Sequence, residues 1–232
     1  MASPSEPGEG HPATPMNVAG LGAFALLCFT SLLAIINPLM AAPVFLSLTD
    51  GYTPVHRQQA LRTATITGAT ILLTFALLGG AIFQVFGITI HAFRIAGGLI
   101  LFGIGLDMLQ AKPSRVRATP EEEREGLGKD AVGITPLGVP ILVGPGSITT
   151  VMVLMGDAPG PVHVAALLLV ICLTLGTTYL LLSQGQRFLR HFGRTGLNVM
   201  TRIMGLLVAV IAVQFVLDGA RPVLIEVLRA AG

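Results

Sequence analysis

Charged residues are scarce in this sequence, at 11% of the 232 positions, whereas a soluble domain carries about 25%. Hydrophobic residues make up 53%, and the mean hydropathy is +0.79. No water-soluble fold can bury that much apolar surface, so the composition excludes a soluble globular protein. Because a membrane-spanning helix needs about 20 mostly apolar residues, the chain has room for six such helices with short connections.

Cysteine is also rare, since only Cys28 and Cys172 occur, both inside apolar runs. They form no CxxC pair and no metal-binding set, so we interpret them as packed thiols. The sequence lacks an HExxH motif, and its histidines are scattered. Residues 103–107 do not match the Gly-x-Gly-Asp pattern of intramembrane proteases, nor do residues 144–147 match Gly-x-Ser-Gly. We therefore expect no enzyme activity, no metal and no cofactor.

The net charge is only +2, and the basic residues lie in connections between apolar segments, which argues against nucleic acid as a partner. Residues 1–18 contain no Lys or Arg, although a secretory signal peptide begins with a basic segment. These residues are rich in Pro, Gly, Ser and Glu. We interpret them as a disordered N-terminal tail, and the first apolar segment as a retained span.

Long apolar segments predict six spans, at residues 20–48, 64–86, 92–110, 134–155, 163–183 and 199–218. The predicted organisation is a first repeat at 19–110, a cytoplasmic linker at 111–132, a second repeat at 133–220 and a C-terminal tail at 221–232. Basic residues follow the first, third and fifth spans: Arg57, Arg62, Lys112, Arg115, Arg117, Arg124, Lys129, Arg187, Arg190 and Arg194. By the positive-inside rule these connections are cytoplasmic, which places both termini outside.

The two halves of the sequence resemble each other weakly. At an offset of 108, residues 93–100 (FRIAGGLI) align with residues 201–208 (TRIMGLLV), so Arg, Ile, Gly and Leu recur in register. At an offset of 107, Asn37-Pro38 aligns with Gly144-Pro145. Because each half has three spans, the halves face opposite ways in the membrane, a plan common among secondary transporters. We predict an all-α polytopic membrane protein of two inverted three-helix repeats.

Prolines interrupt the first and fourth predicted helices. A proline removes a backbone donor, and freed polar groups in hydrocarbon are costly unless protein or water satisfies them. Broken helices therefore belong in the protein interior or along an aqueous cavity, where half-helix ends can hold a carboxylate or a cation. We predict that a small polar solute binds to a set of residues at these breaks, namely Asn37, Pro38, Pro43, Gly144, Pro145, Gly146, Ser147, Thr149 and Thr150.

Four charged residues lie near the ends of predicted spans, where an unpaired charge is costly. Arg94 and Asp218 lie near the outer ends of the third and sixth spans, and Asp107 and Arg202 lie near their inner ends. We hypothesise that Arg94 pairs with Asp218, and Arg202 with Asp107, as gates between the halves. The alternative is a set of interfacial charges that reach toward the lipid headgroups. No carboxylate lies near the midplane, so a coupling ion, Na⁺ or H⁺, is left open.

Residues 37–49 (NPLMAAPVFLSLT) and 135–150 (TPLGVPILVGPGSITT) together resemble the first-span and fourth-span signatures of the MarC family. The resemblance covers nearly the whole chain from about residue 18. It implies a six-span bacterial inner-membrane protein, and some members are assigned to transport of small neutral amino acids, such as alanine and glycine, coupled to a cation gradient. We therefore expect a secondary transporter of a small polar solute. Two alternatives are an aquaporin-like channel, because Asn37-Pro38-Leu39 resembles the Asn-Pro-Ala of aquaporins, and a non-transporting scaffold.

Overall fold

The computed structural model describes residues 20–111 and 137–231. The predicted tail at 1–18, nearly all of the linker at 111–132 and the first residues of the predicted fourth span lie outside the described residues. Along the chain, the described elements are α1 (Leu21–Ile36), α2 (Pro38–Leu48), α3 (Pro54–Phe86), α4 (Ile90–Leu109), the π-helix η1 (Leu137–Leu142), α6 (Pro145–Gly156), α7 (Pro161–Ser183) and α8 (Gly185–Ala231). All regular structure in these residues is helical, as predicted.

Five helical segments in the described part are long and apolar enough to cross a bilayer, where the sequence predicted six. They are Leu21–Leu48, Pro54–Phe86, Ile90–Leu109, Pro161–Ser183 and Thr195–Arg229. The predicted fourth span is divided into η1 and α6, and α6 has only 12 residues. Because a straight span needs about 20 residues, this segment can cross a bilayer only as η1 and α6 together.

Two helices extend well beyond the predicted spans. α3 begins at Pro54 because Thr53 caps it, accepting a hydrogen bond from the amide of His56. Its 33 residues make it about 50 Å long, which exceeds the roughly 30 Å hydrocarbon core. Arg57 therefore lies on a helix that reaches past the apolar core, not in a loop. α8 bends at Gly193 (φ 62°, ψ 178°) and continues through the residues predicted as a C-terminal tail.

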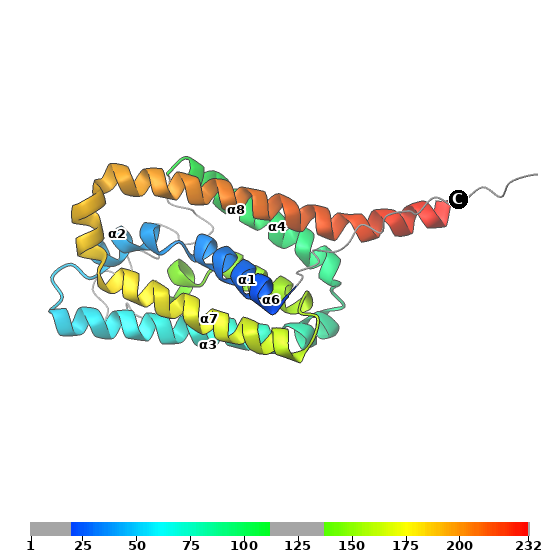
Figure 1. The fold of residues 1–232 in the computed structure, drawn as a ribbon, viewed down its shortest axis with the longest axis horizontal. Coiled ribbons are helices and arrows are strands. Elements are labelled where there is room, and N and C mark those ends of the chain that lie inside the picture. The colour runs from blue at the N-terminus through cyan, green and yellow to red at the C-terminus, as the bar shows by residue number, and fades with distance from the viewer. Residues whose placement is uncertain (1–19, 112–136, 232) are drawn as a thin grey trace, which may run out of the picture.

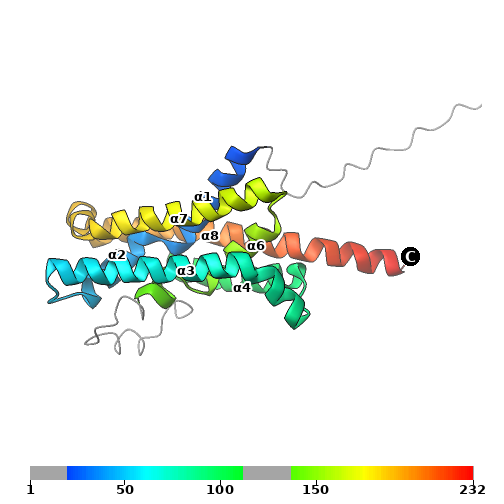
Figure 2. The same ribbon diagram turned by 90° about the horizontal axis from the view of Figure 1, so that it is seen from below.

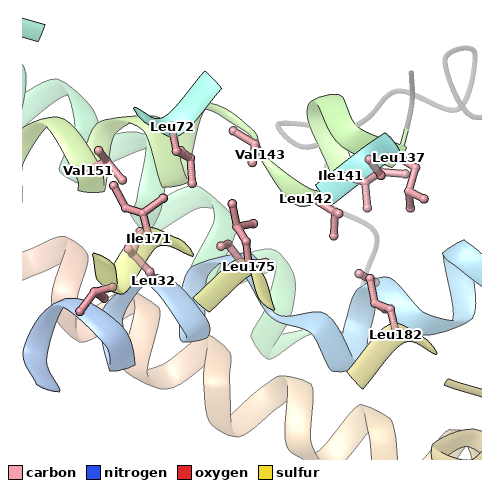
Figure 3. Close-up of a cluster of buried hydrophobic side chains, with 14 of the residues drawn as sticks. Leu32, Leu72, Leu137, Ile141, Leu142, Val143, Val151, Ile171, Leu175 and Leu182 are labelled. Atoms are coloured by element: carbon pink, nitrogen blue, oxygen red, sulfur yellow. The ribbon is translucent and has the colours of Figure 1, made fainter. Parts of the chain in front are cut away.

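The helices form three layers (Figures 1 and 2). α4 and α8 make one layer, α3 and α7 make the opposite layer, and the broken elements α1–α2 and η1–α6 lie between them. One apolar core joins the middle layer to α3 and α7 (Figure 3), and a second joins α1 and α6 to α4 and α8. In the most apolar window of Leu21–Leu48 50% of the residues are buried, against 17% in α3, so the broken first helix lies inside, as predicted.

Gly98 allows α4 and α8 to approach each other closely. A Cβ added to Gly98 would lie 2.8 Å from the carbonyl oxygen of Ala212 and 3.1 Å from the amide nitrogen of Val216. Both are backbone atoms of α8, which cannot move away without moving the helix. Small residues are the usual means of bringing membrane helices this close.

Gly205 makes the matching contact from α8. A Cβ added there would lie 3.0 Å from the carbonyl oxygen of Gly105 and 2.8 Å from the amide nitrogen of Leu109, both in α4. Since later residues of α4 contact earlier residues of α8, the two helices are antiparallel. Subtracting 107 from 205, 212 and 216 gives 98, 105 and 109, so the two sets of contacts are related by one sequence offset.

Candidate functional site

The first break is centred on Asn37, which has a left-handed backbone (φ 45°, ψ 72°). Asparagine is one of the few residues besides glycine that adopt this conformation readily. Its backbone amide donates to the carbonyl of Leu33 at 2.9 Å, which closes α1. Its Oδ1 accepts from the amide of Met40 at 3.4 Å, while Pro38 takes the first position of α2, and Pro43 lies within α2. One residue thus ends one helix and caps the next.

The side-chain amide of Asn37 has an unused donor. Asn37 is 1% exposed, and its Nδ2 is buried without a hydrogen-bond partner. Leaving such a group unsatisfied costs about 1–3 kcal/mol, so buried polar atoms nearly always find a protein, water or ligand partner. The Nδ2 group is therefore suited to donate to a bound solute.

The second break lies between η1 and α6. Val139 is extended inside η1 (φ −134°, ψ 126°), and the amide of Val143 donates to the carbonyl of Gly138 at 3.1 Å. Gly144 is also extended (φ −108°, ψ −177°), and Pro145 takes the first position of α6. Both α2 and α6 therefore begin with a proline at their first position, but Asn37 is left-handed and caps α2, whereas Gly144 is extended.

The start of α6 leaves backbone donors without an acceptor in their own helix. Gly144 provides no side-chain cap for α6. Pro145 has no N–H group, and the amides of Gly146 and Ser147 precede the first position at which an intrahelical acceptor exists. These two amides stand at the positive end of the helix dipole, which favours a carboxylate.

The three hydroxyl residues of α6 are all buried, but only one has a free hydroxyl. Ser147 and Thr150 donate to backbone carbonyls of their own helix, at 3.0 Å and 2.9 Å. Thr149 is 5% exposed and makes no hydrogen bond through its side chain with any described residue. A Cβ added to Gly97 of α4 would overlap the methyl group of Thr149, so α4 holds this side chain in place. Thr149 is therefore the hydroxyl in this set with unused hydrogen-bonding capacity.

The fold brings the two breaks together. A Cβ added to Gly146 would lie 3.5 Å from Ile35 Cγ2, and Ile35 comes two residues before Asn37. The same position would be 3.0 Å from Leu101 and 2.9 Å from Ile104, both of α4. The donors of α6 thus start beside the end of α1 in apolar surroundings. Among the described residues, no group of three His, Cys, Asp or Glu side chains could hold a metal ion.

Neither of the two predicted gating ion pairs is formed among the described residues. Arg94 forms its ion pair with Asp157, which follows α6, so the predicted pairing with Asp218 is wrong. Asp218 instead accepts a hydrogen bond from Gln214, one turn earlier on α8, at 2.8 Å. Asp107 and Arg202 form no ion pair with any described residue.

Asp157 could not be recognised as a partner from its hydropathy context, because it lies in a connection and not in a span. Burial raises the pKa of its carboxyl group above the usual range, the guanidinium of Arg94 opposes that rise, and the nearby charge of Asp218 adds to it. The offset of 107 residues provides a signal in the sequence that points to this residue. Position 157 minus 107 is Asp50, and Asp50 follows the first broken helix as Asp157 follows the second.

Similar proteins occur in bacteria and archaea. The UPF0056 membrane protein YvbG of Bacillus subtilis is 40% identical over 206 residues, which cover 87% of this chain and 98% of that protein. A UPF0056 membrane protein of Methanocaldococcus jannaschii is 39% identical, with 87% and 98% covered, and YhcE of Escherichia coli is 32% identical, with 83% and 90% covered. No solved structure matches the chain significantly. The profile described as MarC family integral membrane protein matches residues 22–224, and the chain therefore belongs to the MarC family of multi-pass integral membrane proteins.

Proposed function

We propose that this protein is a secondary transporter of a small neutral amino acid, or of a similar small polar solute, that works by alternating access around the two helix breaks. It moves its solute without changing it chemically. The observation that carries the proposal is the set of unused donors at the breaks: Nδ2 of Asn37, the amides of Gly146 and Ser147, and the hydroxyl of Thr149.

These donors match one end of an amino acid. The amides at the start of α6 favour a carboxylate, and the buried Nδ2 group can add a further hydrogen bond to it. The end of α1 offers the opposite polarity, because the carbonyl of Ala34 would accept from residue 38, which is a proline. An ammonium group fits beside such carbonyls. The apolar side chains of Ile35, Leu101 and Ile104 around Gly146 favour a small uncharged remainder.

The packing supports an inverted repeat. The α4–α8 contacts at Gly98 and Gly205 are related by the offset of 107 that also relates the two breaks. In the opposite layer, a Cβ added to Gly68 of α3 would lie 3.8 Å from Leu175 of α7, and these positions are again 107 apart. The helices of each pair are antiparallel, as equivalent helices of inverted repeats must be. Alternating access commonly moves one such half against the other around a central site.

The location and the energy source are part of the same proposal. We place the protein in the cytoplasmic (inner) membrane with both termini outside, on the basis of its basic connections and the positive-inside rule. A gradient of Na⁺ or H⁺ drives transport. Carbonyl and hydroxyl oxygens at the breaks suit Na⁺, whereas Asp157, with its raised pKa, suits a proton.

The test is uptake of radiolabelled alanine and glycine into proteoliposomes that contain the purified protein, with Na⁺ and H⁺ gradients imposed separately. Asn37→Asp keeps the Oδ1 cap of α2 but removes the Nδ2 donor, whereas Asn37→Ala removes both. We expect saturable, gradient-driven uptake by the wild type and loss of uptake in both variants. Folding of each variant is checked by gel filtration and circular dichroism.

A matched pair at Thr149 isolates the free hydroxyl. Thr149→Ser keeps the hydroxyl, and Thr149→Val keeps the shape that packs against Gly97. We expect the serine variant to retain uptake and the valine variant to raise KM. Flux that rises linearly with concentration would indicate a pore, and no flux with either gradient would favour another solute or a scaffold role.

A further inference from the structure

One end of the bundle is held by the ion pair between Arg94 and Asp157, and we call it the Arg94 end. Arg94 lies in the second turn of α4, and Asp157 directly follows α6, so the pair ties one half of the chain to the other. The side chains are 14% and 32% exposed. A pair that is partly shielded from water is screened less than a surface pair.

The opposite end carries the repeat counterparts of these residues, and they are not joined. Asp50 corresponds to Asp157 at the offset of 107, and Arg202 corresponds to Arg94 in the alignment of FRIAG with TRIMG. Both Asp50 and Arg202 are exposed, and neither forms an ion pair within the described part of the chain. We call this end the Asp50 end.

The elements that carry Asp50 and Arg202 already pack together. α2 packs on α8, just as α6 packs on α4. Met40 of α2 contacts the core cluster that includes Val208 of α8, and a Cβ added to Gly185 would lie 3.5 Å from Ala42. Figure 1 shows α2 and the first part of α8 at the same end of the bundle.

In an inverted-repeat carrier, the two halves exchange conformations between the states that face opposite sides of the membrane. A contact of α4 with the end of α6 in one state is then made by α8 with the end of α2 in the other. We propose that Asp50 and Arg202 form this counterpart ion pair when the protein opens at the Arg94 end. The pairing rests on the alternating access proposed above and names the residues that close each end.

Two other partners compete with this pairing. The glycine contacts follow the offset of 107, which makes Thr201 the positional counterpart of Arg94, about 100° around the helix from Arg202. Thr201, however, is 4% exposed and uncharged. Arg57 is closer to Asp50 in sequence, but its Nη2 already donates to the carbonyl just before Asp50, at 3.2 Å. The exposed side chain of Arg202, which forms no ion pair with a described residue, is therefore the best partner for Asp50.

Crosslinking tests the pairing without any knowledge of the solute. In a background with Cys28→Ala and Cys172→Ala, one variant carries Asp50→Cys with Arg202→Cys. The register control carries Asp50→Cys with Thr201→Cys. A short bifunctional thiosulfonate is used, because thiols that replace an Arg–Asp pair can lie too far apart for a direct disulfide. Linked peptides are quantified by mass spectrometry of the protein in proteoliposomes.

The competing end provides the decisive comparison. A third variant carries all four cysteines, with Arg94→Cys and Asp157→Cys added to the pair at positions 50 and 202. We expect molecules crosslinked at the Arg94 end to be depleted at least about tenfold in the 50–202 crosslink, because a molecule locked closed at one end cannot reach the state that closes the other. Simultaneous crosslinks at both ends, absence of the 50–202 crosslink, or a stronger 50–201 crosslink would each overturn the pairing.

Charge exchange provides a second measurement on the same pair. Asp50→Arg and Arg202→Asp should each slow uptake by at least about tenfold, and the double exchange should restore it to within about threefold. If the double variant Asp50→Arg with Arg57→Asp restores uptake instead, the partner of Asp50 is Arg57 and the pairing with Arg202 is rejected. If alanine and glycine are not taken up but the two crosslinks exclude each other, the proposed solute is wrong and the pairing of Asp50 with Arg202 is supported. If uptake occurs but the crosslinks do not exclude each other, the pairing is wrong and the proposed transport is supported.

Discussion

Replacing Gly98 by alanine tests the close approach of α4 and α8. The new Cβ would lie 2.7 Å from Val216 Cγ2 and 2.8 Å from the carbonyl oxygen of Ala212. The side chain of Val216 can rotate, but the carbonyl belongs to the helix backbone. Restoring an ordinary contact therefore requires α8 to move by several tenths of an ångström along much of its packed length. Overpacking of this kind costs about 1–3 kcal/mol.

Gly103 is the matched control on the same helix. A Cβ added at Gly103 meets nothing within 4 Å, so its replacement by alanine adds no clash. Alanine also favours a helix over glycine by about 1 kcal/mol, so this variant should be as stable as the wild type or slightly more stable. The two substitutions are chemically identical, and only the packing differs between them.

The assay is unfolding in mixed micelles with rising SDS, followed by circular dichroism, which suits a chain with no tryptophan. Gly98→Ala should lower the free energy of unfolding by about 1–3 kcal/mol, while Gly103→Ala should not lower it. Gly205→Ala should resemble Gly98→Ala, because its Cβ would meet the backbone of α4 at 2.8 Å and 3.0 Å. Equal stability of the Gly98 and Gly103 variants would refute the close approach of α4 and α8. Unequal losses of unfolding free energy in the Gly98 and Gly205 variants would argue against the proposed repeat.

Three further predictions concern the site and its charges. Gly97→Ala should displace Thr149 and lower the affinity for solute about tenfold or more, measured as KM for uptake, because the new methyl would overlap the threonine methyl; an unchanged KM would place Thr149 outside the site. Arg94→Ala should destabilise the protein more than the double change with Asp157→Ala, since the single variant leaves a half-buried carboxylate unpaired; equal losses would mean that the pair is not coupled. Burial raises the pKa of Asp157 above 3.8, so the stability that its protonated carboxyl contributes is lost as pH rises through the raised pKa. Asp157→Asn should remove that part of the pH dependence of the free energy of unfolding. Coincident pH profiles of the variant and the wild type would reject this role of Asp157.

The fold class followed from composition, but the helix boundaries did not. Hydropathy marks only the apolar part of a helix, so it places the polar first turns of α3 and the segment around Gly193 of α8 in connections. The Thr53-Pro54 cap was a local signal that could have placed the start of α3. The prolines of the fourth predicted span predict its break, whereas its division into a π-helix and a 12-residue helix depends on tertiary packing.

The positions of the two helix breaks are predictable from the sequence, but the free donors at these breaks are not. The backbone preferences of Asn37-Pro38 and of Gly144-Pro145 favour helix ends, so the sequence alone predicts where the breaks lie. Whether a hydroxyl is free depends on its rotamer and its neighbours. Ser147 and Thr150 donate to their own helix, while Thr149 packs against α4 and does not, and nothing in the sequence distinguishes the three. The partner of Arg94 could not be recognised from the spans alone, because Asp157 lies in the connection that follows α6.

In the proposed inverted repeat, the position of the two breaks would allow one site to serve both sides of the membrane. Asn37 and Gly144 are 107 residues apart, which is the offset of the glycine contacts between α4 and α8. Ile35 lies two residues before the first break and Gly146 two residues after the second, and these two residues contact each other. Such a contact is centred on the two breaks, as expected if the symmetry axis of the proposed inverted repeat passes between them. Under the proposed alternating access, a solute held there would touch both halves alike, and either end could open while the site between them kept its partners.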